Sequence, residues 1–263
     1  GLGDGNVTPE LARDLYLRSA GWYRDHLDDP ATAAERLKQA LEQDPKSVEA
    51  LTSLEEMQRA AEHRKELVDT LRRLGELSDA GEGVDRSSAE LRREAKTIAE
   101  ELGELELAEQ ILRDMLAVDD ADVWALTELC EVCARKEEHE ELLQHLRRRM
   151  ELMPEPDELR ELRHRAATLA AEQLDDLDTA LDLYEQAFEG DPHDDVASEG
   201  LRKLYERLQR YDDMLRFTER LVDLADTAEA RAELRLSCAK LCIEQLDAPS
   251  EGIEHLHAII DEV

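Results

Sequence analysis

The sequence predicts an all-α protein, a solenoid of about seven antiparallel helix hairpins. Its 263 residues consist mostly of Leu, Ala, Glu, Asp and Arg, of which all but Asp favour helices, and only 3% are aromatic. Small and apolar residues recur at long, nearly constant intervals along the chain. Within each interval, apolar residues are spaced four and seven apart, which places them on one face of a helix.

The long repeat is marked by four leucines, each preceded by an alanine seven residues earlier and followed by a small residue six residues later. The leucines are separated by 75, 72 and 72 residues. The alanines are Ala20, Ala95, Ala167 and Ala239, the leucines are Leu27, Leu102, Leu174 and Leu246, and the small residues are Ala33, Ala108, Ala180 and Gly252. Further leucines predict two hairpins of about 36 residues in each long repeat.

Glycine, proline and acidic residues divide the chain into segments. Residues 1–8 are expected to be a disordered leader or a remnant of expression. The loops richest in helix breakers are 79–86 and 153–156. We therefore expect hairpins 1 and 2 in residues 9–78, hairpins 3 and 4 in 87–153, hairpins 5 and 6 in 157–226, and hairpin 7 in 228–263, continuing in a longer protein.

The second helix of two hairpins carries a recognisable pattern, in which a small residue is followed by Leu or Tyr, then Ala, then Pro. The two matches are Ala33, Leu37, Ala40, Pro45 and Ala180, Tyr184, Ala187, Pro192. This pattern resembles the second-helix signature of the tetratricopeptide repeat, and the resemblance covers essentially residues 9–263. It implies a right-handed superhelix whose concave groove, lined by the first helix of each hairpin, binds a segment of another protein.

Composition excludes several classes of function. The net charge of −33, from 66 acidic and 33 basic residues, would repel nucleic acid. No run of about 18 apolar residues could span a bilayer. The chain begins without the features of a signal peptide, so we expect a cytoplasmic protein, with a periplasmic or secreted one as the alternative. An excess of acidic residues also keeps a protein soluble, and it is typical of adaptation to a salty or GC-rich bacterial background.

No catalytic motif is present, so we expect no enzyme activity, no cofactor and no metal. The cysteines fall in two helical pairs, Cys130 with Cys133 and Cys238 with Cys242. We interpret them as reduced core thiols, because a chain of this length can bury a core without disulfides. The first pair also matches a CxxC motif, which leaves metal or redox chemistry as an alternative.

The family resemblance also indicates which side chains face the groove: those three before, one after and four after the small position of each first helix. These positions are relatively basic in a very acidic chain, so we expect a partner with an acidic segment. A carboxylate clamp is disfavoured because the only asparagine is Asn6. Together with Trp124, which could anchor a ligand or pack on the preceding hairpin, the candidate groove residues are Arg24, Arg59, Arg92, Lys96, Trp124, His164, Arg202 and Lys240.

A second hypothesis makes the array a structural spacer or a self-assembling segment of a larger protein. The last predicted helix carries Ile253, Leu256, Ile259 and Ile260, which one preceding helix cannot bury completely. Repeat arrays normally end in a polar capping face. We therefore expect another repeat, or another copy reached through the C-terminal hairpin, to cover these side chains.

Overall fold

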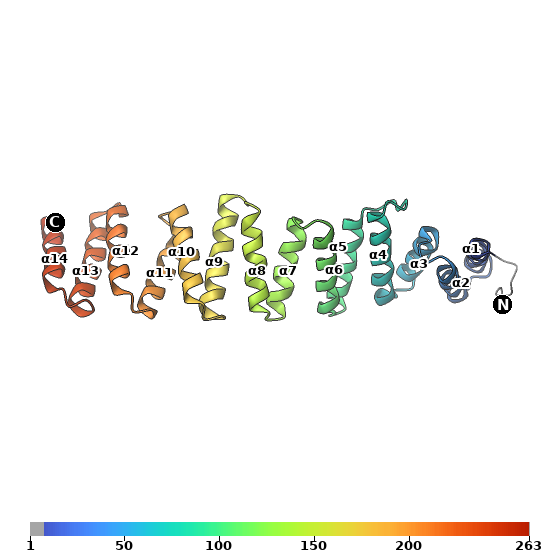
Figure 1. Ribbon diagram of the computed structural model, residues 1–263, viewed down its shortest axis with the longest axis horizontal. Helices are drawn as coiled ribbons and strands as arrows, with labels where there is room; N and C mark the ends of the chain where they lie inside the picture. Colours follow the sequence, from blue (N-terminus) through green and yellow to red (C-terminus); the bar gives the residue numbers. More distant parts are fainter. Residues whose placement is uncertain (1–7, 263) are drawn as a thin grey trace. The chain divides into compact units, whose positions relative to one another are not determined.

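The computed structural model describes residues 8–262, and those residues form fourteen α-helices and no strand (Figure 1). The all-α prediction is therefore confirmed. Seven residues of the expected leader lie outside the described part; the eighth, Thr8, caps the first helix by accepting a hydrogen bond from the Leu11 amide. Among the described helices, none has a stretch long and apolar enough to cross a membrane.

The chain divides into two compact units, which meet in sequence between Lys136 and Glu137. The division falls in the loop of the fourth expected hairpin. The N-terminal unit contains α1 (Pro9–His26), α2 (Pro30–Gln43), α3 (Val48–Ala60), α4 (Arg64–Asp79), α5 (Ser88–Glu101), α6 (Leu105–Val118) and α7 (Val123–Arg135). The C-terminal unit contains α8 (His139–Glu151), α9 (Pro156–Glu172), α10 (Leu177–Gly190), α11 (Asp195–Arg207), α12 (Tyr211–Leu224), α13 (Ala228–Glu244) and α14 (Pro249–Glu262).

Within each unit every helix packs against the next one along the chain. Odd-numbered helices are the first helices of the expected hairpins, and even-numbered helices are the second. Each second helix from α2 to α12 therefore contacts both its own first helix, where the two lie in one unit, and the first helix of the following hairpin. This stacking buries apolar side chains that no single hairpin could cover.

Acidic residues at the helix junctions act as caps. Asp176 accepts a hydrogen bond from the Thr179 amide at 3.1 Å and so begins α10. Asp194 does the same for α11, accepting from the Ala197 amide at 2.9 Å. The hydrogen bonds from Thr179 hold the pKa of Asp176 below its usual value. Each cap satisfies an amide that the helix itself leaves unpaired.

Every first helix is followed by a residue in the left-handed conformation. These residues have φ between 50° and 77°, and only one is glycine: Asp28, Glu62, Gly103, Glu137, Asp175, Gln209 and Asp247. A left-handed residue reverses the chain immediately after a helix. Side chains in this conformation are strained by about 1–2 kcal/mol, so the packing of the following helix has to hold them there.

The four alanines of the long repeat all lie at buried positions. Ala20, Ala95, Ala167 and Ala239 are each at most 3% exposed. In the last hairpin, a methyl group built on Gly252 would lie 3.0 Å from the Ala239 carbonyl oxygen. The absence of larger side chains is what allows α13 and α14 to approach so closely.

The four cysteines are free thiols and all are buried. Cys238 and Cys242 pack with Leu215 and Val222 of α12. Burial raises the pKa of the Cys238 thiol to about 12 and also raises that of Cys242. The pair on α13 therefore forms part of the apolar core, and the thiolate form is disfavoured at neutral pH.

Replacing Gly200 by alanine is expected to lower the melting temperature. A methyl group at this position would lie 2.6 Å from the Tyr184 ring, whose hydroxyl group is 3.0 Å from the Thr168 hydroxyl. Overpacking of this kind costs about 1–3 kcal/mol, more than the roughly 0.5–1 kcal/mol that alanine contributes inside a helix.

The matched control is Gly21→Ala, because Gly21 lies within α1 and a methyl group there meets nothing within 4 Å. This variant should raise the melting temperature. Thermal unfolding followed by circular dichroism compares the two variants, and stabilisation by both would contradict the packing of α10 against α11.

Candidate binding cleft

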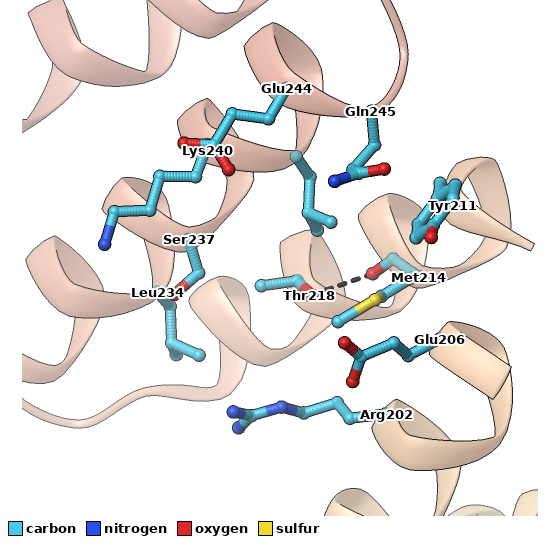
Figure 2. Close-up of a pocket in the computed structure, with 11 residues that line it drawn as sticks. Arg202, Glu206, Tyr211, Met214, Thr218, Leu234, Ser237, Lys240, Glu244 and Gln245 are labelled. Carbon is cyan, nitrogen blue, oxygen red and sulfur yellow. Dashed lines mark hydrogen bonds between the residues drawn. The ribbon is translucent and has the colours of Figure 1, made fainter. Parts of the chain in front are cut away.

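A cleft of about 230 Å³ is formed by three consecutive helices of the C-terminal unit (Figure 2). We call it the α11–α13 cleft. It is lined from α11 by Arg202 and Glu206, from α12 by Tyr211, Met214 and Thr218, and from α13 by Leu234, Ser237, Lys240, Leu241 and Glu244, with Gln245 at the C-cap of α13. Two of the predicted groove residues, Arg202 and Lys240, are thus brought to one place.

The cleft has an apolar part made by Met214, Leu234 and Leu241. Two of the three hydroxyl groups that line the cleft are directed to their own helices: Thr218 donates to the Met214 carbonyl oxygen at 2.7 Å (Figure 2), and Ser237 donates to the Glu233 carbonyl oxygen at 3.1 Å. Because both hydroxyls are already used within helices, the apolar side chains offer a surface on which an apolar side chain of a ligand can pack.

The charged side chains of the cleft are Arg202, Glu206, Lys240 and Glu244, and all four are exposed. Within residues 8–262, neither Arg202 nor Lys240 has an ion-pair partner. In the view of Figure 2, their charged ends lie on either side of Leu234 and Ser237. The lining is neutral overall, two cations against two carboxylates, in a chain of net charge −33. An acidic ligand therefore meets less repulsion here than over the acidic surface in general.

Two of the predicted groove residues, Arg92 and Lys96 on α5, are not available to a ligand. They are only 6% and 4% exposed. Arg92 donates to Asp79 at 2.6 Å, and Lys96 forms ion pairs with Glu100, at 2.8 Å, and with Glu128 of α7. Their assignment as groove residues that meet a partner is therefore wrong. Their charges are buried, and acids from neighbouring helices neutralise them.

Two further groove candidates of the N-terminal unit are exposed but paired. Arg24 contacts Asp25 at 2.8 Å. Arg59 of α3 forms ion pairs with Glu94 and, at 2.6 Å, with Glu55. The hydrogen bond to Glu94, with that to Glu55, raises the pKa of Arg59 above its already high value. The Arg24 guanidinium is thus used by an adjacent residue, and the Arg59 guanidinium joins α3 to α5.

The two aromatic candidates also have partners inside the array. Trp124 is half-buried and stacks beneath Arg93, whose guanidinium carbon lies 4.8 Å from the ring centroid, with Lys96 at 5.7 Å. It therefore packs on the preceding hairpin, which was one of its two expected roles. His164 Nε2 lies 2.6 Å from Asp194, the cap of α11. That contact joins α9 to the start of α11.

The two signature segments recognised in the sequence occupy equivalent, buried positions on second helices. Ala33, Leu37 and Ala40 lie on α2, and their counterparts Ala180, Tyr184 and Ala187 lie on α10; each is at most 7% exposed. Together with the buried alanines of the first helices and the stacking of successive hairpins, this packing defines the structural class of the protein. The protein is an array of tetratricopeptide-like helix hairpins.

Comparison with known proteins gives low similarities. No protein-family model and no curated protein sequence matches the chain. Among solved structures, the chain is similar to YrrB, a TPR protein with an unusual peptide-binding site. The two sequences are 18% identical, the match covers 69% of this chain and 88% of YrrB, and the TM-score is 0.36. It is also similar to PilF of Pseudomonas aeruginosa, with 16% identity and a TM-score of 0.38. That match covers 94% of this chain and 91% of PilF. A tetratricopeptide repeat protein of Parabacteroides merdae shows 15% identity, coverage of 95% and 93%, and a TM-score of 0.34.

Proposed function

We propose that the protein is a non-enzymatic interaction scaffold that binds a segment of a partner protein in the α11–α13 cleft. The observation that carries the proposal is the pair of exposed cations, Arg202 and Lys240, beside the apolar surface of Met214 and Leu234. Elsewhere in the predicted groove, Arg24, Arg59, Arg92 and Lys96 are paired with acids of the chain itself. Free cations beside an apolar surface favour a segment that carries both carboxylates and an apolar side chain.

The size of the cleft limits the bound element. A volume of about 230 Å³ is less than most sites for drug-sized ligands, which occupy about 300–1,000 Å³. It suits one or two side chains of a longer segment, with the rest lying along the neighbouring helices. The exposed cations supply only about 0.2–1 kcal/mol each, so binding should be weak and sensitive to salt.

The experiment uses two short synthetic peptides labelled with a fluorophore. One carries glutamates with interspersed leucines, and the other has every glutamate replaced by glutamine. The wild-type protein should bind the glutamate peptide more tightly, measured by fluorescence anisotropy at low salt. The double variant Arg202→Gln/Lys240→Gln should lose about 2- to 30-fold of affinity, which corresponds to two contacts of about 0.2–1 kcal/mol each.

A matched double variant controls for the change in net charge. Lys203 and Arg216 are exposed residues of α11 and α12 that do not line the cleft. Lys203→Gln/Arg216→Gln changes the net charge by the same amount and should leave affinity unchanged. Equal losses in both double variants, or equal affinity of the wild type for both peptides, would refute the proposed site.

A further inference from the structure

A pocket of about 380 Å³ is formed by α2, α3 and α4 in the N-terminal unit. We call it the α2–α4 pocket. Its volume falls within the range of about 300–1,000 Å³ that is usual for ligand sites. Leu41 of α2 and Leu54 of α3 give it apolar walls, and both side chains are buried. An aliphatic chain of a ligand can therefore pack inside it.

Gln58 of α3 also lines this pocket, and its side chain lacks a partner. The residue is only 6% exposed, and no described residue donates a hydrogen bond to its amide oxygen. A buried acceptor without a donor destabilises a fold, so it points to a group that the free chain does not supply. Because the last torsion of a glutamine is broad, the amide can turn its oxygen toward a donor held in the pocket.

Three carboxylates at the pocket are also unpaired. Glu42, Glu66 and Asp69 are exposed, and within residues 8–262 none of these carboxylates forms a hydrogen bond or an ion pair. The cations of the lining are Lys38 and Arg73, and Arg73 already donates to a backbone carbonyl oxygen at 3.0 Å. Free acceptors therefore outnumber free donors, which favours a ligand that is cationic and donates hydrogen bonds.

A corresponding pocket of about 290 Å³ lies in the C-terminal unit. Each of its lining residues comes 147 positions after one of the α2–α4 pocket, as Tyr205 does after Gln58. There, the Tyr205 hydroxyl donates to Glu185 at 2.9 Å, and Arg216 takes the place of Asp69. The C-terminal pocket thus satisfies its own polar group and carries an additional cation, so it does not suit a cationic ligand.

Gln58 also borders a cavity formed by α3, α4 and α5. The charged side chains of that cavity are already used, because Arg59 pairs with Glu94 and Arg64 pairs with Glu101. A charged ligand there has to displace these ion pairs. The unsatisfied amide and the free carboxylates coincide in the α2–α4 pocket.

We propose that the α2–α4 pocket binds an arginine side chain of a partner protein. The aliphatic part of this side chain packs against Leu41 and Leu54, and the guanidinium group donates to Gln58, Glu66 and Asp69. A guanidinium suits this set because it has five N–H donors and keeps its charge when partly buried. The net charge of −33 attracts basic segments of other proteins and repels the carboxylate of a free amino acid. The proposal is independent of the α11–α13 cleft, which takes a ligand of the opposite charge.

The test uses N-acetylarginine methylamide, a blocked arginine that mimics one residue of a protein segment. Its neutral isostere, N-acetylcitrulline methylamide, controls for shape. Nuclear magnetic resonance follows the side-chain amide signal of Gln58, which is assigned by its absence in Gln58→Met. The blocked arginine should shift this signal until it saturates, and the citrulline compound should not. No saturable shift, equal shifts from the two compounds, or tighter binding of free arginine would overturn the proposal.

Two double variants show whether the carboxylates take part. Glu66→Gln/Asp69→Asn should weaken binding of the blocked arginine about 2- to 30-fold, as expected for two exposed contacts. The matched control is Glu76→Gln/Glu106→Gln, which changes the net charge equally at exposed residues that do not line the pocket. The control should bind like the wild type. Equal weakening in both would mean general attraction to an acidic surface and would rule out the site.

Gln58→Met keeps the length of the side chain and removes the amide. Binding, read here from the backbone amide signal of Thr70 in the same pocket, should weaken roughly 10-fold, as for loss of a hydrogen bond to a charged group. The melting temperature should be equal to or above that of the wild type, because an unsatisfied buried polar group is gone. Unfolding then cannot explain the loss, and undiminished binding would contradict the role of Gln58.

Discussion

Replacing Lys96 by glutamate is expected to lower the free energy of unfolding of the N-terminal unit by about 3–5 kcal/mol, the loss typical of breaking a buried ion pair. The ammonium group of Lys96 lies between Glu100 of its own helix and Glu128 of α7, and the side chain is only 5% exposed. A glutamate there would leave three carboxylates together with little access to water. Urea unfolding followed by circular dichroism measures the loss.

The equivalent residue on α13 provides the control. Lys240 lies one residue after Ala239, as Lys96 lies one residue after Ala95, but it is exposed and has no ion-pair partner in the described part of the chain. Lys240→Glu should therefore change stability by no more than about 0.5 kcal/mol. Similar losses from both substitutions would mean that Lys96 is not held between acids of two helices.

Replacing Phe188 by alanine is expected to cost about 3–5 kcal/mol in the C-terminal unit, the usual range for a buried aromatic residue. The ring is 1% exposed and meets Phe217 of α12 edge to face, with centroids 5.0 Å apart. Removing it leaves a cavity between α10 and the following hairpin. The midpoint of urea unfolding should fall accordingly.

Ile260 occupies the same position on α14 and is the matched control. Because Ile260 is 71% exposed, Ile260→Ala should cost no more than about 0.5 kcal/mol. A large loss from Ile260→Ala would show that this side chain is buried in the folded chain.

Helix positions could be predicted from the sequence because they depend on local spacing. The buried alanines at 20, 95, 167 and 239 repeat at nearly constant intervals, and close helix crossings require a small residue. The acids that begin α10 and α11 were predictable for the same reason, since a cap acts within its own turn. The left-handed residues after the first helices were missed. A partial signal exists: a leucine directly precedes five of the seven left-handed residues, as in Leu27 before Asp28 and Leu102 before Gly103.

The candidate site was only partly predictable, because ion pairing depends on residues distant in sequence. Lys96 and Glu128 are 32 residues apart, and Arg92 and Asp79 are 13 apart. Counting charges at groove positions therefore could not separate the buried cations of α5 from the exposed cations of α11 and α13. The apolar part of the cleft was missed too. Met214 lies on a second helix, and the groove rule considers only first helices.

The location of a bound acidic segment tests the proposed function most directly. Hydrogen–deuterium exchange, read by mass spectrometry with and without a saturating amount of the glutamate–leucine peptide, reports which helices become protected. We predict slower exchange in α11 and α13, around Glu206 and Glu244, with α3 and α5 unchanged. Protection of α3 and α5 instead, or none in α11 and α13, would contradict binding in the α11–α13 cleft.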